Sequence, residues 1–169
     1  IQTINLKQLI KQTNGEFEEK FENRQLSMVC TLPEEEMLIR ADGRRMWRVI
    51  ENLYNNAAKY AMPGSRIYVD GMCAAGKVTV IIKNISESPL NFDAEELMER
   101  FVRGDVSRNT EGSGLGLEIA RNLTIMMNGK FDIYLDGDLF KVILTFNLAH
   151  KEQEPENKEQ GQTMSDDEK

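Results

Sequence analysis

The stretch ENLYNNAAKY at residues 51–60 is the most informative part of this chain. Asn52, Asn56 and Lys59 recur every three to four residues, so a helix would place them on one face. Asn is a mediocre helix former because its amide competes for backbone hydrogen bonds, so two aligned asparagines require an explanation. An Asn carbonyl oxygen is a hard, neutral ligand for Mg²⁺, and a Lys ammonium neutralises phosphate oxygens. Taken alone, the stretch is also typical of a solvated helix face.

A second stretch, EGSGLGL at residues 111–117, is rich in glycine. Glycines let the backbone approach phosphates closely, and a helix that starts here would offer free N–H groups to an anion. The stretch is neither a Walker A motif, because the lysine is missing, nor a dinucleotide-binding fingerprint after a strand. By itself it is equally typical of a flexible loop. Together with residues 51–60 it predicts a site for a nucleoside triphosphate and a bound cation.

Composition restricts the class of protein. The chain has 169 residues, 40% of them hydrophobic, which fits one globular domain with a tail. A net charge of −7 argues against a nucleic-acid or anionic-membrane binder. No apolar run approaches the roughly 20 residues that span a bilayer, and no signal peptide is visible. Cys30 and Cys73 form neither a zinc motif nor a disulfide framework, which indicates a reduced, intracellular domain. Because the chain starts at Ile1 rather than Met, we expect a piece of a longer protein.

Local patterns predict the elements of the first half of the chain. INLKQLI (4–10) reads as strand-like and leads into a charged helical segment, EFEEKFENR (16–24). Short apolar runs at 26–30 and 37–40 fit two strands. Asp42 is placed to cap a helix over 44–61, and Pro63-Gly64 would end it.

The second half reads as two hairpins around a long connection. The hairpins are predicted at 66–73 with 77–84, and at 130–136 with 140–149. Between them, residues 85–114 are mostly irregular with a short helix at DAEELMERF, and a connection this long is typical of a functional lid. An amphipathic helix over 115–127 would end before Asn128-Gly129.

These elements predict an α+β fold in which helices cover one face of a mixed, mostly antiparallel sheet, a two-layer α/β sandwich. The expected domain runs over residues 1–149. Residues 150–169 form an acidic tail with almost no apolar side chains, and we expect this tail to be disordered.

Two motifs in this order resemble a known family. RVIENLYNNAAKYA is similar to the N box, and ELMERFVRGDVSRNTEGSGLGLEIARNL is similar to the F box, lid and G2 box, of the catalytic and ATP-binding domain (HATPase_c) of bacterial sensor histidine kinases in the GHKL ATPase superfamily. The resemblance covers roughly residues 4–149 and implies the Bergerat ATP-binding fold. It implies transfer of the γ-phosphoryl group of Mg-ATP to a His on upstream dimerisation helices, in two-component signal transduction with a response regulator. The fragment would be monomeric alone, without nucleic-acid partners, and would be the cytoplasmic domain of a membrane-anchored kinase.

The resemblance also implies roles for individual residues. Asn56 would bind Mg²⁺ with support from Asn52, and Lys59 and Tyr60 would face the phosphates and the ribose edge. Arg103 or Arg108 would lie near the γ-phosphate, or could instead hold the lid by ion pairs. The catalytic set would be Asn56, Lys59 and Arg103. Further nucleotide contacts are expected from Phe101, which anchors the lid, and from Gly112, Ser113, Gly114, Leu115, Gly116 and Leu117, which wrap the phosphates.

One part of the family pattern is degenerate. The G1 box, Asp-x-Gly-x-Gly, carries the Asp that reads the adenine amino group, but this chain has Asn84, Ser86 and Ser88 at the Asp and glycine positions. An Asn carbonyl oxygen still accepts a hydrogen bond, although more weakly than a carboxylate. We therefore expect ATP binding with reduced affinity or altered base selectivity.

Two alternatives stay open at the level of sequence. Another GHKL ATPase would hydrolyse ATP with a Glu general base, for which Glu51 is the nearest candidate, although it lies off the face of Asn52. A non-catalytic pseudokinase that docks on partners would explain the eroded G1 box. The single histidine, His150, has no helical context and reads as an incidental surface residue, so the phosphoacceptor would lie outside this chain.

Overall fold

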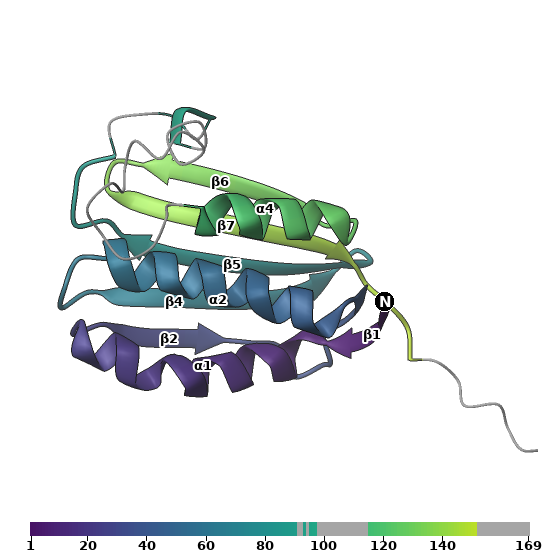
Figure 1. Ribbon diagram of the computed structural model, residues 1–169. Coiled ribbons are helices and arrows are strands. Elements are labelled where there is room, and N and C mark those ends of the chain that lie inside the picture. Colours follow the sequence, from purple (N-terminus) through teal and green to yellow (C-terminus); the bar gives the residue numbers. More distant parts are fainter. Residues whose placement is uncertain (91–92, 94, 98–114, 152–169) are drawn as a thin grey trace, which may run out of the picture.

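The computed structural model describes residues 1–90, 93, 95–97 and 115–151 (Figure 1). The elements, in chain order, are β1 (Gln2–Asn5), α1 (Leu6–Asn23), β2 (Ser27–Thr31), β3 (Leu38–Ala41), α2 (Gly43–Tyr60), β4 (Arg66–Ala74), β5 (Lys77–Ile85), α4 (Gly116–Met126), β6 (Lys130–Asp136) and β7 (Leu139–Asn147). The short helix expected at 93–101 is described only in part. Its start carries a capping box, because Asp93 Oδ1 accepts from the Glu96 N–H at 2.8 Å and Glu96 faces back to the Asp93 N–H.

The strands form one large and one small sheet. The large sheet has the order β2-β4-β5-β7-β6, in which only the β2–β4 pair is parallel, and β1 pairs with β3 in a separate antiparallel ribbon. Helices α1, α2 and α4 lie on the same side of the large sheet (Figure 1). The predicted α+β sandwich with a mostly antiparallel sheet and helices on one face is therefore confirmed.

The start of the chain differs from the prediction. Residues 4–10 were expected to be strand-like, but β1 ends at Asn5 and α1 begins at Leu6. Asn5 caps the helix, since its Oδ1 accepts from the Lys7 N–H at 3.2 Å. The side chains that α1 buries recur at helical spacing, at Leu6, Ile10, Thr13, Phe17 and Phe21. The strand prediction is wrong here because Asn5 caps a helix inside the apolar run, and the helical period only becomes visible over the whole segment.

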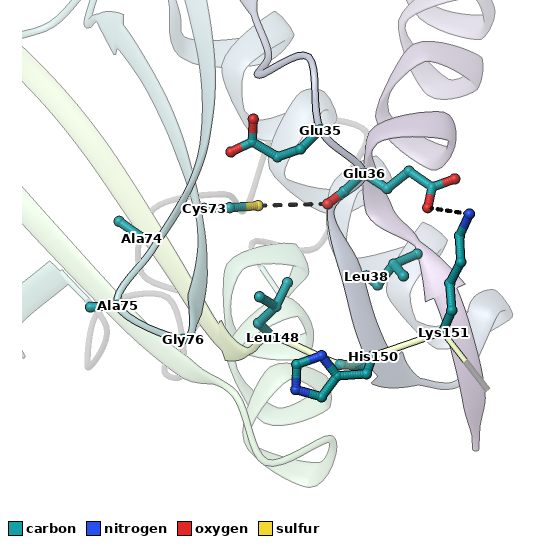
Figure 2. A pocket seen from close by; sticks show the side chains of 11 residues that line it. Glu35, Glu36, Leu38, Cys73, Ala74, Ala75, Gly76, Leu148, His150 and Lys151 are labelled. Atoms are coloured by element: carbon teal, nitrogen blue, oxygen red, sulfur yellow. Dashed lines mark hydrogen bonds and ion pairs between the residues drawn. The ribbon is translucent and has the colours of Figure 1, made fainter. Parts of the chain in front are cut away.

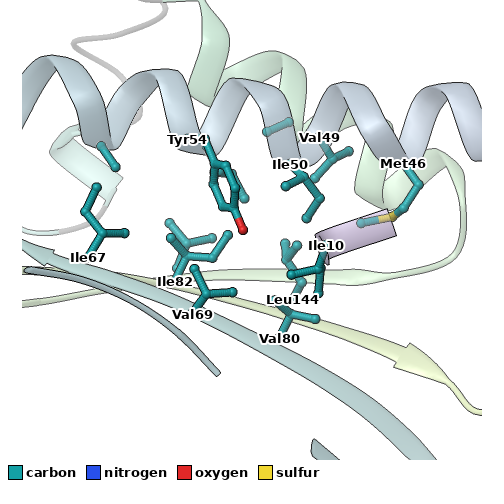
Figure 3. Packing of buried hydrophobic residues seen from close by; sticks show 14 of the residues in the cluster. Ile10, Met46, Val49, Ile50, Tyr54, Ile67, Val69, Val80, Ile82 and Leu144 are labelled. Atoms are coloured by element: carbon teal, nitrogen blue, oxygen red, sulfur yellow. The ribbon is translucent and has the colours of Figure 1, made fainter. Parts of the chain in front are cut away.

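Helix α2 follows the prediction closely. Asp42 caps it by accepting from the Arg45 N–H at 3.0 Å, and this hydrogen bond lowers the pKa of the Asp42 carboxyl. The apolar side of α2 points at side chains from the sheet, among them Val69, Val80 and Ile82 (Figure 3). The buried residues of α2 are Met46, Val49, Ile50, Leu53, Tyr54, Ala57 and Ala58. Asn52 and Asn56 do not belong to this buried set, so their side chains are not part of the apolar core.

Tyr54 joins α2 to α1 in the core. Its ring is fully buried, and it meets the Phe17 ring edge-on with the centroids 5.4 Å apart. Its hydroxyl donates to Asn14 Oδ1 at 2.6 Å, which satisfies the one polar atom of the side chain. Burial raises the pKa of Tyr54 well above its usual range, so the hydroxyl stays a donor.

We expect Tyr54→Phe to lower the free energy of unfolding by about 1 kcal/mol, because the change removes one hydrogen bond and keeps the ring. Urea denaturation followed by circular dichroism measures the difference. Tyr134→Phe is the matched control, because Tyr134 is 51% exposed on β6 and its loss should change stability by less than about 0.5 kcal/mol. Equal effects of the two changes would contradict the role of the Asn14 bond.

The structure at the end of α4 gives a second reason for glycine at position 129, which the sequence indicated only as part of a helix stop. Asn128 has a positive φ of 61°, and the Gly129 N–H donates to the Thr124 carbonyl at 2.9 Å, so the helix ends in a Schellman motif. A Cβ atom at Gly129 would lie 2.5 Å from the Phe146 ring on β7. The prediction that the helix ends before Asn128-Gly129 is confirmed, and close packing against the sheet is the added reason for glycine.

Candidate functional site

Helices α2 and α4 bring the two sequence motifs together. Asn52 Nδ2 donates to the Arg48 carbonyl at 2.8 Å, which fixes the orientation of the carboxamide. A Cβ atom at Gly116 would lie 3.2 Å from Asn52 Oδ1, so the first turn of α4 passes directly over this oxygen. Glycine at position 116 is therefore explained by close approach of the two helices. A residue with a side chain would press on Asn52.

The first turn of α4 is suited to an anion. Its N-cap residue is Leu115, which provides no capping side chain, and the Ile119 N–H donates to the Leu115 carbonyl at 2.8 Å. The N–H groups of the turn before Ile119 have no partner within the helix. Leu115 is 40% exposed, whereas Leu117 is buried in the core, so Leu117 would offer a ligand its backbone rather than its side chain.

The last turns of α2 carry the other predicted residues. Asn56, Lys59 and Tyr60 are each half-buried. Lys59 Nζ lies 5.2 Å from the centroid of the Tyr60 ring, which is the geometry of a cation–π contact. The ammonium thus lies against the Tyr60 ring near the end of the helix.

Asn84 lies on the helix-facing side of β5, where burial alternates along the strand. It is 3% exposed, and its carboxamide makes no hydrogen bond to any residue among those the structure describes. A buried polar group normally has a hydrogen-bond partner, and a ligand that reached this carboxamide could supply one.

The chain after Asn84 is attached to the end of α2. The Met62 N–H donates to the Ile85 carbonyl at 2.9 Å, and the Glu87 N–H donates to the Tyr60 carbonyl at 2.8 Å. Ser86 is buried, and its N–H donates to the Asp138 carbonyl at 2.7 Å in the β6–β7 turn. The segment with serines at the family's glycine positions is therefore held by backbone hydrogen bonds on two sides.

Several predicted residues lie outside the described part of the chain. They are Phe101, Arg103, Arg108, Gly112, Ser113 and Gly114. Conversely, the structure brings in Arg24, which sequence reasoning missed. Its guanidinium contacts backbone carbonyls at the end of α2 and the carboxylate of Glu87, and no local pattern in the sequence marks such contacts.

The donor set fits a cation that a ligand helps to bind. Within residues 1–90, 93, 95–97 and 115–151, no group of three or more His, Cys, Asp or Glu side chains could hold a metal. Asn56 could contribute one neutral oxygen, and the phosphate oxygens of a nucleotide could supply further ligands. In the same part of the chain, no helix combines the length and the apolar character needed to cross a membrane.

A separate cavity of about 480 Å³ lies at the other end of β5 (Figure 2). There the Glu36 carboxylate pairs with Lys151 at 3.2 Å, and the Cys73 thiol points at the Glu36 carbonyl at 3.8 Å. Burial raises the pKa of the Cys73 thiol. The cavity is lined by none of the predicted site residues, so it is distinct from the site around Asn52 and Asn84.

Comparisons with known proteins identify the family of this chain. The family described as "Histidine kinase-, DNA gyrase B-, and HSP90-like ATPase" matches residues 41–165. The signal transduction histidine-protein kinase BaeS of Escherichia coli is 28% identical over 129 residues, which cover 75% of this chain and 27% of BaeS. The adaptive-response sensory kinase SasA of Thermosynechococcus vestitus is 28% identical over 135 residues, 79% of this chain and 35% of SasA. The chain thus spans about a quarter to a third of the length of these relatives.

Solved structures give the same result. A nucleotide-free catalytic domain of the histidine kinase ThkA superposes with a TM-score of 0.73 at 26% identity, covering 86% of this chain and 94% of that domain. The match extends over nearly the whole of that catalytic domain. This chain therefore belongs to the histidine kinase-, DNA gyrase B- and HSP90-like ATPase family, as a catalytic domain of the sensor histidine kinase type.

Proposed function

We propose that this chain binds Mg-ATP and, as part of a longer sensor kinase, transfers the γ-phosphoryl group to a His outside residues 1–169. The observation that carries the proposal is the contact between Asn52 and Gly116, which joins the asparagine face of α2 to the glycine-marked start of α4. The kinase would be membrane-anchored with this domain in the cytoplasm. Its partners would be its own upstream dimerisation helices and a response regulator.

Each end of the nucleotide has candidate residues. Asn56 would hold Mg²⁺ through its carbonyl oxygen, and Lys59 would neutralise phosphate oxygens. The first N–H groups of α4 would bind a phosphate, and Arg103 or Arg108 would approach the γ-phosphate. The Asn84 carbonyl oxygen would accept from the adenine amino group. The chain's own contribution to phosphoryl transfer would be positioning and charge neutralisation.

A second candidate function is that of a pseudokinase module. The neutral, buried Asn84 at the base-reading position favours it, because a carboxylate is the stronger acceptor. Phosphotransfer from γ-labelled ATP by the full-length kinase separates the two. Label on a His residue supports the kinase, whereas nucleotide binding without label supports the pseudokinase. Hydrolysis without label would instead indicate an ATPase that uses Glu51.

We expect Asn84→Asp to tighten Mg-ATP binding about fivefold to tenfold, because a charge-assisted hydrogen bond is worth about 1 kcal/mol more than a neutral one. Without nucleotide the same variant should be less stable, since its carboxylate would be buried without a partner. Isothermal titration calorimetry and thermal melting measure the two effects.

Asn84→Leu is the paired variant, because it keeps the approximate size and removes the acceptor. It should weaken ATP binding while leaving the apoprotein at least as stable. Unchanged affinity in both variants would show that Asn84 does not contact the base.

A further inference from the structure

Arg24 follows the last residue of α1 and is held in place by the way this helix ends. The Gln25 N–H donates to the Glu22 carbonyl at 2.9 Å, and the Leu26 N–H donates to the Phe21 carbonyl at 2.9 Å, which is a Schellman motif. Gln25 takes the positive φ of 58° that this motif requires. The end of α1 is therefore well defined, and it directs the Arg24 side chain to α2.

The guanidinium of Arg24 binds the carbonyls at the end of α2. Arg24 Nε donates to the Ala58 carbonyl at 2.8 Å, and Nη2 donates to the carbonyls of Lys59 at 3.3 Å and Ala61 at 3.2 Å. The last carbonyls of a helix have no partner within it and carry its negative dipole end, so a fixed cation stabilises them. The planar fork of Arg serves several acceptors at once, which a Lys ammonium does less well.

The same guanidinium reaches the chain that follows β5. Arg24 Nη2 lies 3.6 Å from Glu87 Oε2, and the two side chains are 36% and 55% exposed, so this ion pair alone is weak. The Glu87 N–H, however, donates to the Tyr60 carbonyl at 2.8 Å. Arg24 thus lies where the end of α2 and the segment three residues beyond Asn84 meet.

We propose that Arg24 is a positioning residue that sets the separation between the phosphate end and the base end of the nucleotide site. The inference rests on the proposed function. Lys59 and Tyr60 would contact the phosphates and the ribose, and Asn84 would contact the base. Arg24 holds the end of α2 against the segment that follows β5, and these two parts of the backbone carry the two sets of contacts. Arg24 precedes residues 41–165, the part of the chain that the ATPase family matches.

Arg24→Met tests this, because it keeps the aliphatic stem and removes every polar contact. Lys20→Met is the matched control, since Lys20 also joins α1 to α2, through Asn55, but at a distance from the end of α2. Affinities for Mg-ATP and for adenosine are measured by titration on the full 169-residue chain, well below the melting temperature. Adenosine engages only the base end, whereas ATP must engage both ends at the correct separation.

We expect Arg24→Met to weaken Mg-ATP binding about tenfold and adenosine binding less than twofold, with Lys20→Met unchanged for both. The Mg-ATP affinity of Arg24→Lys should lie between those of wild type and Arg24→Met. If Arg24→Met does not fold, the affinity of Arg24→Lys provides the test. Equal loss of both ligands, or no loss of either, would overturn the role of Arg24. A wild-type chain that does not bind Mg-ATP would instead refute the proposed function.

Discussion

Replacing Gly129 by Ala should lower the free energy of unfolding by about 3 kcal/mol, because the added methyl group overpacks a rigid, buried contact. The Cβ atom would lie 2.5 Å from the Phe146 ring, which is itself 3% exposed and cannot move aside without disturbing β7. Either the last turn of α4 or the ring must shift. Thermal and urea denaturation measure the loss.

Gly15→Ala is the control of opposite sign. Gly15 lies in the middle of α1, and a Cβ atom there would meet nothing within 4 Å. The change should stabilise the domain by about 0.5–1 kcal/mol, because Ala loses less backbone entropy in a helix. If both substitutions changed stability in the same direction, the packing explanation for Gly129 would be wrong.

Replacing Asn56 by Ala should weaken Mg-ATP binding about a hundredfold, because the change would remove the ligand that we propose for the ion. The effect should depend on magnesium, so that wild type and variant bind ATP with similar affinity when the ion is chelated. Calorimetric titration with and without EDTA measures this.

Asn55→Ala is the control from the neighbouring position. Asn55 accepts a hydrogen bond from Lys20 on α1, and it lies off the face that carries Asn52 and Asn56. We expect its loss to change the ATP affinity less than about twofold, since exposed polar contacts contribute little. A magnesium-independent defect in Asn56→Ala would contradict a role as metal ligand.

Helix α2 could be predicted from the sequence because its signals are local. The Asp42 cap, the helical spacing of the buried residues and the Pro63-Gly64 stop all agree, and the structure confirms them. The prediction for residues 4–10 is wrong, because a short apolar run fits a strand or a helix and only the Asn5 cap distinguishes the two.

The contacts around the candidate site could not be predicted from the sequence. The spacing of Asn52 and Asn56 showed one helix face, yet nothing local indicates that Gly116 lies over Asn52 Oδ1. The contacts of Arg24 were unpredictable for the same reason, because backbone carbonyls exist at every position and leave no pattern in the sequence. Close approach and capping between separate helices depend on the tertiary fold.

The strand order also bears on how the chain folds. The β4–β5 and β6–β7 hairpins pair neighbouring segments and close only short loops. By contrast, β2 pairs with β4 in a register that places Ser27 opposite Arg66, and β3 and α2 lie between these two strands in the chain. Pairing at such sequence separation carries the larger entropic cost and forms late. We therefore expect the edge strand β2 and the helix α1 to join the sheet after the β4–β5 and β6–β7 hairpins have formed. The hydrogen bonds from Arg24 to the end of α2 would then be among the last native contacts to form.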